Sequence, residues 1–203
     1  MPDIRTLLAK TVPRRRDAPP TLDITFLMPE IRSLWQKHLR TNVETGACLA
    51  DNGVGVSLVN HTFGTQTGVS PRCSSEEHAA HLGFIHVHPS ADYMIGFSDV
   101  DYRSTVLSGD RLSLVYNGEQ VFALLRTDEA ATAHARLSEL ERLWANASSE
   151  ASLVSHLYGQ VRSIEPVFSP TQLLCWINDA SSALLGFVWY GGVGDGLLIR
   201  QGK

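Results

Sequence analysis

The sequence predicts a mixed α/β domain in which one central β-sheet is flanked by helices, and three observations support this class. Hydrophobic side chains recur at three- and four-residue spacing across residues 23–40, which indicates an amphipathic helix. The dipeptides Asn52-Gly53 and Asn117-Gly118 each separate two apolar segments, a pattern typical of a β-hairpin. Residues 82–86 form a short apolar segment that ends in a histidine, which predicts a buried strand.

The remaining elements follow from the same periodicities and from the turn residues between them. Residues 65–75 are polar and predict a loop, and a helix is expected to begin at Ser98. In chain order the elements are a helix at 23–40, a hairpin of 43–50 with 54–59, a short helix at 76–81, a strand at 82–86, a helix across 98–107, a hairpin of 111–116 with 120–126, a helix from 130 to about 161 with a candidate break at Ser148-Ser149, a short helix at 171–178, and strands at 184–190 and 197–200. This order implies helical layers packed on one sheet.

The length and composition suit one domain, or one domain with an appendage. The chain has 203 residues, of which 43% are hydrophobic. Residues 1–22 contain prolines and arginines without periodicity, so a flexible N-terminal arm is expected there. Residues 23–130 carry the regular α/β pattern and are assigned to the main domain. Residues 131–203 are expected to form a C-terminal extension of helices and a hairpin, packed on the domain.

Charge, hydropathy and cysteine content exclude several classes of protein. The formal net charge of −4 gives no electrostatic reason to expect a nucleic-acid partner. No window reaches about 20 uninterrupted apolar residues, so no membrane span is expected, and the N-terminal residues lack the apolar core of a signal peptide. The three cysteines are widely spaced and form no Cys-x-x-Cys pair, which argues against a disulfide framework. A reducing, cytoplasmic location is therefore expected.

Two histidines at the end of the predicted strand 82–86 suggest a metal site. His86 and His88 are two residues apart, so their side chains are expected on the same face of the strand. A carboxylate from the following helix could complete a site with three protein ligands, and the free fourth position is typical of catalytic zinc. Ligand type alone leaves Fe²⁺ and Mn²⁺ open. The alternative interpretation is a pair of structural histidines that are hydrogen-bonded in a loop.

The wider pattern resembles the JAMM (MPN-plus) metalloprotease motif. The family has an upstream glutamate, then His-x-His-Pro, then Ser-x-x-Asp; here Glu44 precedes HVHP at 86–89 and SDVD at 98–101. The resemblance covers roughly residues 23–126. It implies an MPN fold for the main domain, Zn²⁺ as the cofactor, and His86, His88 and Asp101 as its ligands. It also implies that Glu44 is the general base and that Ser98 stabilises the oxyanion of the tetrahedral intermediate.

The spacing of the aspartate departs from the family. The serine and aspartate usually fall eight and eleven residues after the second histidine, but Ser98 and Asp101 fall ten and thirteen residues after His88. Strict counting would make Asp99 the ligand and would put Gly96 in the place of the serine. Asp101 is preferred because Ser-x-x-Asp across one helical turn keeps both side chains on one face, whereas a loop tolerates insertion.

The resemblance implies hydrolysis of the isopeptide or peptide bond that follows the C-terminus of a ubiquitin-like protein. The substrate and partner would be such a protein or its conjugate, in a bacterial ubiquitin-like conjugation system. Two alternatives remain open: processing of a sulfur-carrier protein at the same site, and a catalytically silent MPN scaffold that binds a partner protein. Silent members lose a histidine or the aspartate, whereas this chain retains the five residues of the motif, and this favours an enzyme.

Overall fold

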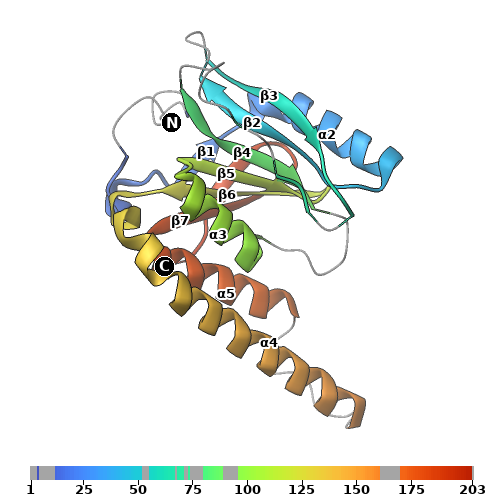
Figure 1. The fold of residues 1–203 in the computed structure, drawn as a ribbon, viewed down its shortest axis with the longest axis vertical. Helices are drawn as coiled ribbons and strands as arrows, with labels where there is room; N and C mark the ends of the chain where they lie inside the picture. Colours follow the sequence, from blue (N-terminus) through green and yellow to red (C-terminus); the bar gives the residue numbers. More distant parts are fainter. Residues whose placement is uncertain are drawn as a thin grey trace.

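The computed structural model contains an eight-stranded mixed β-sheet with helices on both faces (Figure 1). It describes residues 4, 12–51, 55–66, 68–70, 73, 80–88, 96–160 and 170–202. The strands are β1 (Thr21–Asp23), β2 (Thr45–Asp51), β3 (Val56–Phe63), β4 (His81–Val87), β5 (Leu112–Tyr116), β6 (Gln120–Arg126), β7 (Phe187–Val193) and β8 (Leu197–Arg200). Their order in the sheet is β1-β8-β7-β6-β5-β4-β2-β3. The predicted α/β class, with a mixed central sheet flanked by helices, is confirmed.

The two predicted hairpins are the antiparallel pairs β2–β3 and β5–β6. Every paired neighbour in the sheet is antiparallel except β4 and β5, which are parallel. A parallel pair needs a crossover connection, and the helix α3 (Asp99–Ser108) supplies it. The crossover therefore places the start of α3 beside the end of β4, where the two histidines of the motif lie.

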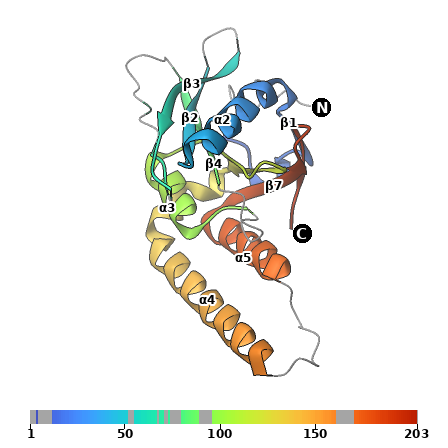
Figure 2. The ribbon, with the colours of Figure 1, turned by 90° about the vertical axis from the view of Figure 1, so that its right-hand side faces the viewer.

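The helix α2 (Met28–Thr41) covers one face of the sheet, and the helices α3, α4 (Leu137–Gln160) and α5 (Pro170–Leu185) lie on the other (Figure 2). On the first face, Ile31 and Leu34 of α2 join a core with side chains from all eight strands. On the other face, the buried residues of α3, α4 and α5 include Tyr102, Leu140 and Leu185. The described part of the chain also contains the 3₁₀ helices η1 (Arg15–Asp17), η2 (Thr25–Leu27) and η3 (Asp128–Arg136).

The C-terminal helices differ from the prediction in their bounds. The helix expected from residue 130 begins as η3 and becomes α-helical at Leu137, and α4 runs through Ser148-Ser149 without the candidate break. That break was wrong because no proline or glycine is near the serine pair to interrupt the helix. The helix expected at 171–178 extends to Leu185 and stops before Gly186, whose φ of +73° is a conformation typical of a helix end.

Both ends of the chain contribute strands to the same sheet. The described part of the expected arm 1–22 includes Thr21 and Leu22, which pair with Ile199 and Leu198 of β8. The strand β7 in turn pairs along its whole length with β6. The extension 131–203 therefore supplies two strands as well as two helices, and its strands lie in the sheet that carries the histidine motif.

The strand β4 contains an irregularity that decides which side chains face α3. Between Gly83 and His81 the register against β2 shifts by one residue, so Leu82 is the extra residue of a β-bulge. Leu82, Ile85 and Val87 consequently join the core under α2, while His81 and Phe84 face the opposite side. Gly83 lies against the carbonyl of Leu112, where a Cβ atom would be only 1.8 Å from the carbonyl oxygen.

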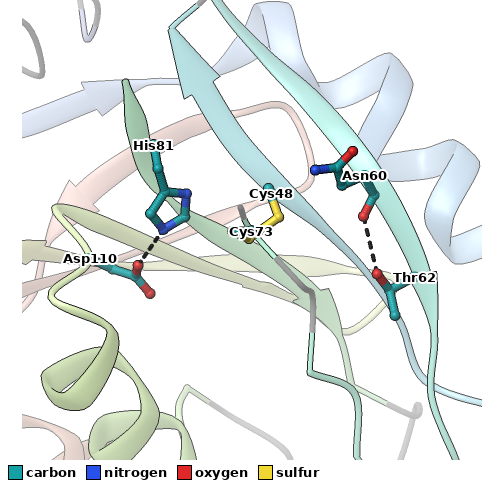
Figure 3. The surroundings of a disulfide bond; sticks show 6 residues. All are labelled: Cys48, Asn60, Thr62, Cys73, His81 and Asp110. Carbon is teal, nitrogen blue, oxygen red and sulfur yellow. Dashed lines mark hydrogen bonds and ion pairs between the residues drawn. A yellow bond between two sulfur atoms is a disulfide. The ribbon is translucent and has the colours of Figure 1, made fainter. Parts of the chain in front are cut away.

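The expectation that the cysteines form no disulfide was wrong. Cys48 in β2 and Cys73, in the connection between β3 and β4, are disulfide-bonded (Figure 3). Their Cα atoms are 5.6 Å apart although they lie 25 positions apart in the sequence. The tertiary fold brings Cys73 to the β2 strand, and linear spacing could not reveal this. The cysteines therefore no longer support the expected reducing location; Cys175 is free.

Two further expectations concern parts of the chain that are only partly described. The helix expected at 76–81 lies outside the described residues except for Ala80 and for His81, which begins β4. Pro89 of the motif and most of the loop 90–97 also lie outside them. Within the described part of the chain, no helix combines the length and the apolar character that crossing a bilayer requires.

Candidate metal centre

Three potential metal ligands meet where β4 ends and α3 begins. The Nε2 atoms of His86 and His88 are 2.9 Å apart. The carboxylate of Asp101 places Oδ1 3.0 Å from Nε2 of His86 and Oδ2 3.2 Å from Nε2 of His88. All three residues offer ligand atoms within 4.8 Å of one another, and they are largely buried. The predicted histidine pair thus lies on one face and meets a carboxylate from the next helix.

The donor set fits a divalent cation. Two imidazole nitrogens and a carboxylate converge here, and a single cation can accept a lone pair from each of them. Nδ1 of each histidine is buried and has no hydrogen-bond partner among the described residues, so the hydrogen bonds that direct the two rings there are the Nε2 contacts within the cluster. Nitrogen and oxygen ligands without a thiolate suit Zn²⁺ and also Fe²⁺ or Mn²⁺. These three residues could therefore hold a metal ion, and the geometry leaves the identity of the metal open.

The end of β4 fixes the two histidines through its neighbours. His86 pairs with Gly46 of β2 and with Val115 of β5, so its backbone lies inside the sheet. Its ring stacks on Phe84, with the ring centroids 5.5 Å apart. His88 follows the strand, and its backbone N–H donates to the carbonyl of Tyr116 at 3.0 Å. The β-ladder therefore extends up to the second histidine and orients both side chains toward α3.

The first turn of α3 fixes Asp101. Ser98 is the N-cap residue, and its Oγ accepts a hydrogen bond from the backbone N–H of Asp101 at 3.2 Å. In return, Oδ2 of Asp101 accepts from the backbone N–H and from the hydroxyl of Ser98, both at 2.8 Å. This reciprocal pair is a capping box, which satisfies two backbone donors that a helix start leaves free. Ser98 and Asp101 therefore share one face of the turn.

The charge state of Asp101 suits a ligand. Burial by itself would raise the pKa of this carboxyl, but the charge of His86 and the hydrogen bonds from both histidines hold the pKa well below its usual range. Asp101 is therefore an anion at neutral pH. Asp99, which strict counting would choose, is not part of the cluster; it occupies the first position of α3, directly after the N-cap.

We expect Asp101→Ala to lose the bound metal and Asp99→Ala to keep it. The reason is geometric, because, of these two residues, it is Asp101 whose carboxylate reaches both Nε2 atoms. Successive helical residues differ by about 100° in direction, so Asp99 points away from the face that Ser98 and Asp101 share. The measurement is metal per chain after reconstitution with zinc and gel filtration. Loss of metal from Asp99→Ala alone would show that strict counting identifies the ligand.

Glu44 approaches the same site from the start of β2. The helix α2 ends at Thr41, and its C-cap residue Asn42, with a φ of +54°, turns the chain back toward the sheet. Nδ1 of the buried His38 then hydrogen-bonds to the carbonyl of Val43 at 2.8 Å, and the Thr45 hydroxyl donates to the carbonyl of Leu34 at 3.0 Å. Glu44 is held between these two anchors, and it is only 6% exposed.

The Glu44 side chain has the electrostatic surroundings of a proton acceptor. Burial raises the pKa of its carboxyl above the ordinary value, and the nearby charge of His88 opposes that rise. The negative charge of Asp101 raises the pKa further. A carboxylate whose pKa is shifted toward neutrality is a better base than an ordinary surface glutamate.

A groove of about 680 Å³ contains all of these residues. It is lined by the motif residues Glu44, His86, His88, Ser98 and Asp101. One wall is α3, and the other is formed by residues 68–70 and Cys73 of the connection between β3 and β4. The floor continues along β4 past Phe84 to His81. The groove thus extends beyond the three potential metal ligands.

The far end of the groove contains an ionisable pair that no sequence motif indicates. Nε2 of His81 lies 2.8 Å from Oδ1 of Asp110, which is buried, and both residues line the groove. His81 faces the groove because of the bulge at Leu82, and strict alternation along the strand would have placed it on the opposite face from Phe84 and His86. A register shift of this kind leaves no clear signal in a single sequence.

Asn178 of α5 is a second residue that sequence reasoning missed. It is fully buried, and its Oδ1 accepts a hydrogen bond from the backbone N–H of Phe97 at 2.9 Å. The hydroxyl of Tyr102 donates to the carbonyl of Asn178 at 3.0 Å and also lies 2.8 Å from Oγ of Ser182. The C-terminal extension thereby anchors Phe97, which precedes Ser98, and Tyr102, which follows Asp101.

We expect Asn178→Ala to lower both the stability of the protein and its affinity for metal. Removing the amide leaves the buried N–H of Phe97 without this acceptor, which costs about 1–3 kcal/mol of unfolding free energy. The start of α3 then loses an anchor, so metal affinity should fall severalfold without being abolished. Chemical denaturation and a competitive zinc titration measure the two effects. Gln172→Ala, an exposed position on the same helix, is the matched control and should change neither.

Comparisons with known proteins did not identify a relative of this chain. A scan against models of protein families found no match, and a search of curated proteins found no significant match either.

Proposed function

We propose that the protein is a zinc-dependent peptidase of the JAMM type with an MPN fold. Its reaction would be hydrolysis of the peptide or isopeptide bond after the C-terminus of a ubiquitin-like protein. The observation that carries the proposal is that Glu44, His86, His88, Ser98 and Asp101, which span 58 positions of the sequence, line one groove. The β4–α3–β5 crossover places His88, after β4, beside Asp101 of α3. This crossover supports the proposed MPN fold.

The proposed roles follow from the chemistry of each group. His86, His88 and Asp101 would hold the ion, which supplies the Lewis acidity that makes water acidic near neutral pH and polarises a carbonyl. Glu44 would accept a proton from water and deliver it to the leaving amine, because its raised pKa suits both transfers. A buried carboxylate that lies outside the ligand cluster but lines the same groove is well placed for this role.

Ser98 would stabilise the oxyanion of the tetrahedral intermediate. Its hydroxyl donates to Asp101 in this structure, and rotation about the Cβ–Oγ bond would redirect that hydrogen toward a substrate oxygen. Its Oγ can meanwhile keep accepting from the Asp101 backbone, because a hydroxyl offers one donor and two acceptor sites. One such donor typically contributes about 3 kcal/mol to transition-state stabilisation. The N-cap role and the catalytic role are therefore compatible.

The test is cleavage by the zinc-loaded protein. Linear fusions and lysine-linked conjugates of several ubiquitin-like proteins, including sulfur-carrier proteins, would be incubated with it and analysed by mass spectrometry. We expect cleavage directly after the terminal glycine of at least one modifier, and none in the presence of a chelator. Stable binding of a modifier without cleavage of any fusion would favour the silent scaffold. Release of only a short C-terminal extension from a sulfur carrier would favour the processing alternative.

A further inference from the structure

We propose that the Cys48–Cys73 disulfide is a redox-controlled strap that holds one wall of the substrate groove in place. With the bond formed, the wall is positioned for substrate; with the bond reduced, the wall is released and substrate binding weakens. The inference rests on the proposed function for the identity of the substrate. The disulfide would control substrate binding, and neither cysteine belongs to the catalytic motif.

The disulfide joins the wall to the centre of the β2–β4 region. Cys48 is 2% exposed and pairs with Val59 of β3 on one side and with Phe84 of β4 on the other. Directly paired residues point to the same face of a sheet, so Cys48 shares the groove face with Phe84. Figure 3 shows the bond beside His81 and Asp110, the pair at the far end of the groove. The disulfide is therefore anchored at Cys48, in a strand that is paired on both sides.

The other half of the bond belongs to the wall itself. Gly68, Val69, Ser70 and Cys73 line the groove opposite Val100, Ser104 and Ser108 of α3. These wall residues lie outside the strands of the sheet, so no β-ladder holds them. Among the described residues of this connection, Cys73 alone is attached covalently to another part of the chain. The disulfide is therefore the covalent tie between the described wall residues and the sheet.

The same connection is hydrogen-bonded to the backbone of Glu44. The N–H of Glu44 donates to the carbonyl of Thr65 at 2.7 Å, and the N–H of Gly64 donates to the carbonyl of Glu44 at 2.8 Å. Thr65 in turn donates its N–H to the carbonyl of Gly68, where the wall begins, at 2.8 Å. A change in the wall is thereby passed to the backbone of the proposed base, while the metal ligands, on β4 and α3, are held by other contacts.

The bond is placed where a reductant can reach it. Cys73 is partly exposed and lines the open groove, whereas Cys48 is buried. A small dithiol would attack Sγ of Cys73 as a thiolate, forming a mixed disulfide and releasing the thiol of Cys48. The second thiol of the reductant would then displace Cys73. In sum, the dithiol becomes a disulfide, and two electrons and two protons convert Cys48 and Cys73 to free thiols.

The first measurement needs no enzymatic activity. Hydrogen exchange at the amides of Glu44 and Gly64 would be compared in the oxidised full-length protein, in the reduced protein, and in Cys73→Ser. We expect exchange at both amides to quicken at least about tenfold on reduction and in Cys73→Ser, because the wall that adjoins them is no longer tied down. Zinc per chain should stay the same in all three. Unchanged exchange would overturn the inference whatever the activity of the protein.

The second measurement separates binding from chemistry. With a modifier fusion as substrate, KM should rise about tenfold in Cys73→Ser, since the wall must then be ordered on binding, and kcat should change less than about threefold. Reduction should raise KM in the same way in the parent and in Cys175→Ser, and reoxidation should restore the original KM. Reduction should not change the KM of Cys73→Ser further. A KM that is equal in the two redox states would overturn the inference. If exchange responds as expected and the oxidised parent cleaves nothing, the strap stands and the proposed function falls.

Discussion

His86→Ala and His88→Ala are each expected to abolish zinc binding while leaving the fold intact. Each change removes one of three converging ligand atoms, and the remaining histidine and Asp101 form too small a set to hold the ion. Among the residues that the structure describes, neither ring has a hydrogen-bond partner at Nδ1, so its loss breaks no such bond there. We expect less than about a tenth of the parental zinc after gel filtration, with a circular dichroism spectrum like that of the parent.

The matched control for the histidine variants is His81→Ala. His81 lies on the same strand and lines the same groove, but its ring is paired with Asp110 instead of the cluster. It should therefore retain the parental zinc content. Full zinc in both His86→Ala and His88→Ala would refute the ligand assignment, and loss of zinc from all three variants would show that the strand, not the ligand set, had been damaged.

Glu44→Gln is expected to keep zinc and to lose at least about a hundredfold in the rate of hydrolysis. The amide is nearly isosteric with the carboxylate, so the backbone hydrogen bonds to residues 64 and 65 should survive, but it accepts no proton from water. The measurement is kcat/KM on a modifier fusion, together with zinc per chain. Glu30→Gln is the control, because Glu30 lies in the first turn of α2 and does not line the groove. Parental activity in Glu44→Gln would remove this residue from the mechanism.

The raised pKa of Glu44 gives this variant two further signatures. Since the base must be charged, the activity of the parent should fall as the pH is lowered through the pKa of Glu44, and Glu44→Gln should lack this acidic limb. A pKa raised by folding also means that ionisation costs stability as the pH rises. In the metal-free protein at neutral pH, Glu44→Gln should therefore be no less stable than the parent in chemical denaturation.

Local patterns in the sequence were enough for the parts of the fold and site that neighbouring residues decide. Asn52-Gly53 and Asn117-Gly118 predicted the hairpins β2–β3 and β5–β6, because such dipeptides favour tight turns between apolar strands. The two-residue period of a strand put His86 and His88 on one face. One helical turn put Ser98 and Asp101 on one face, where they form the capping box.

Only the tertiary structure decided the contacts between residues that are distant in the sequence. The meeting of Cys48 with Cys73 depends on how the connection after β3 folds back onto the sheet, and the support of Phe97 by Asn178 spans 81 positions. The bulge that directs His81 into the groove depends on the register between β4 and β2. A single sequence determines the period of each strand and helix, but register and packing are set by many weak contacts that act together across the whole sheet.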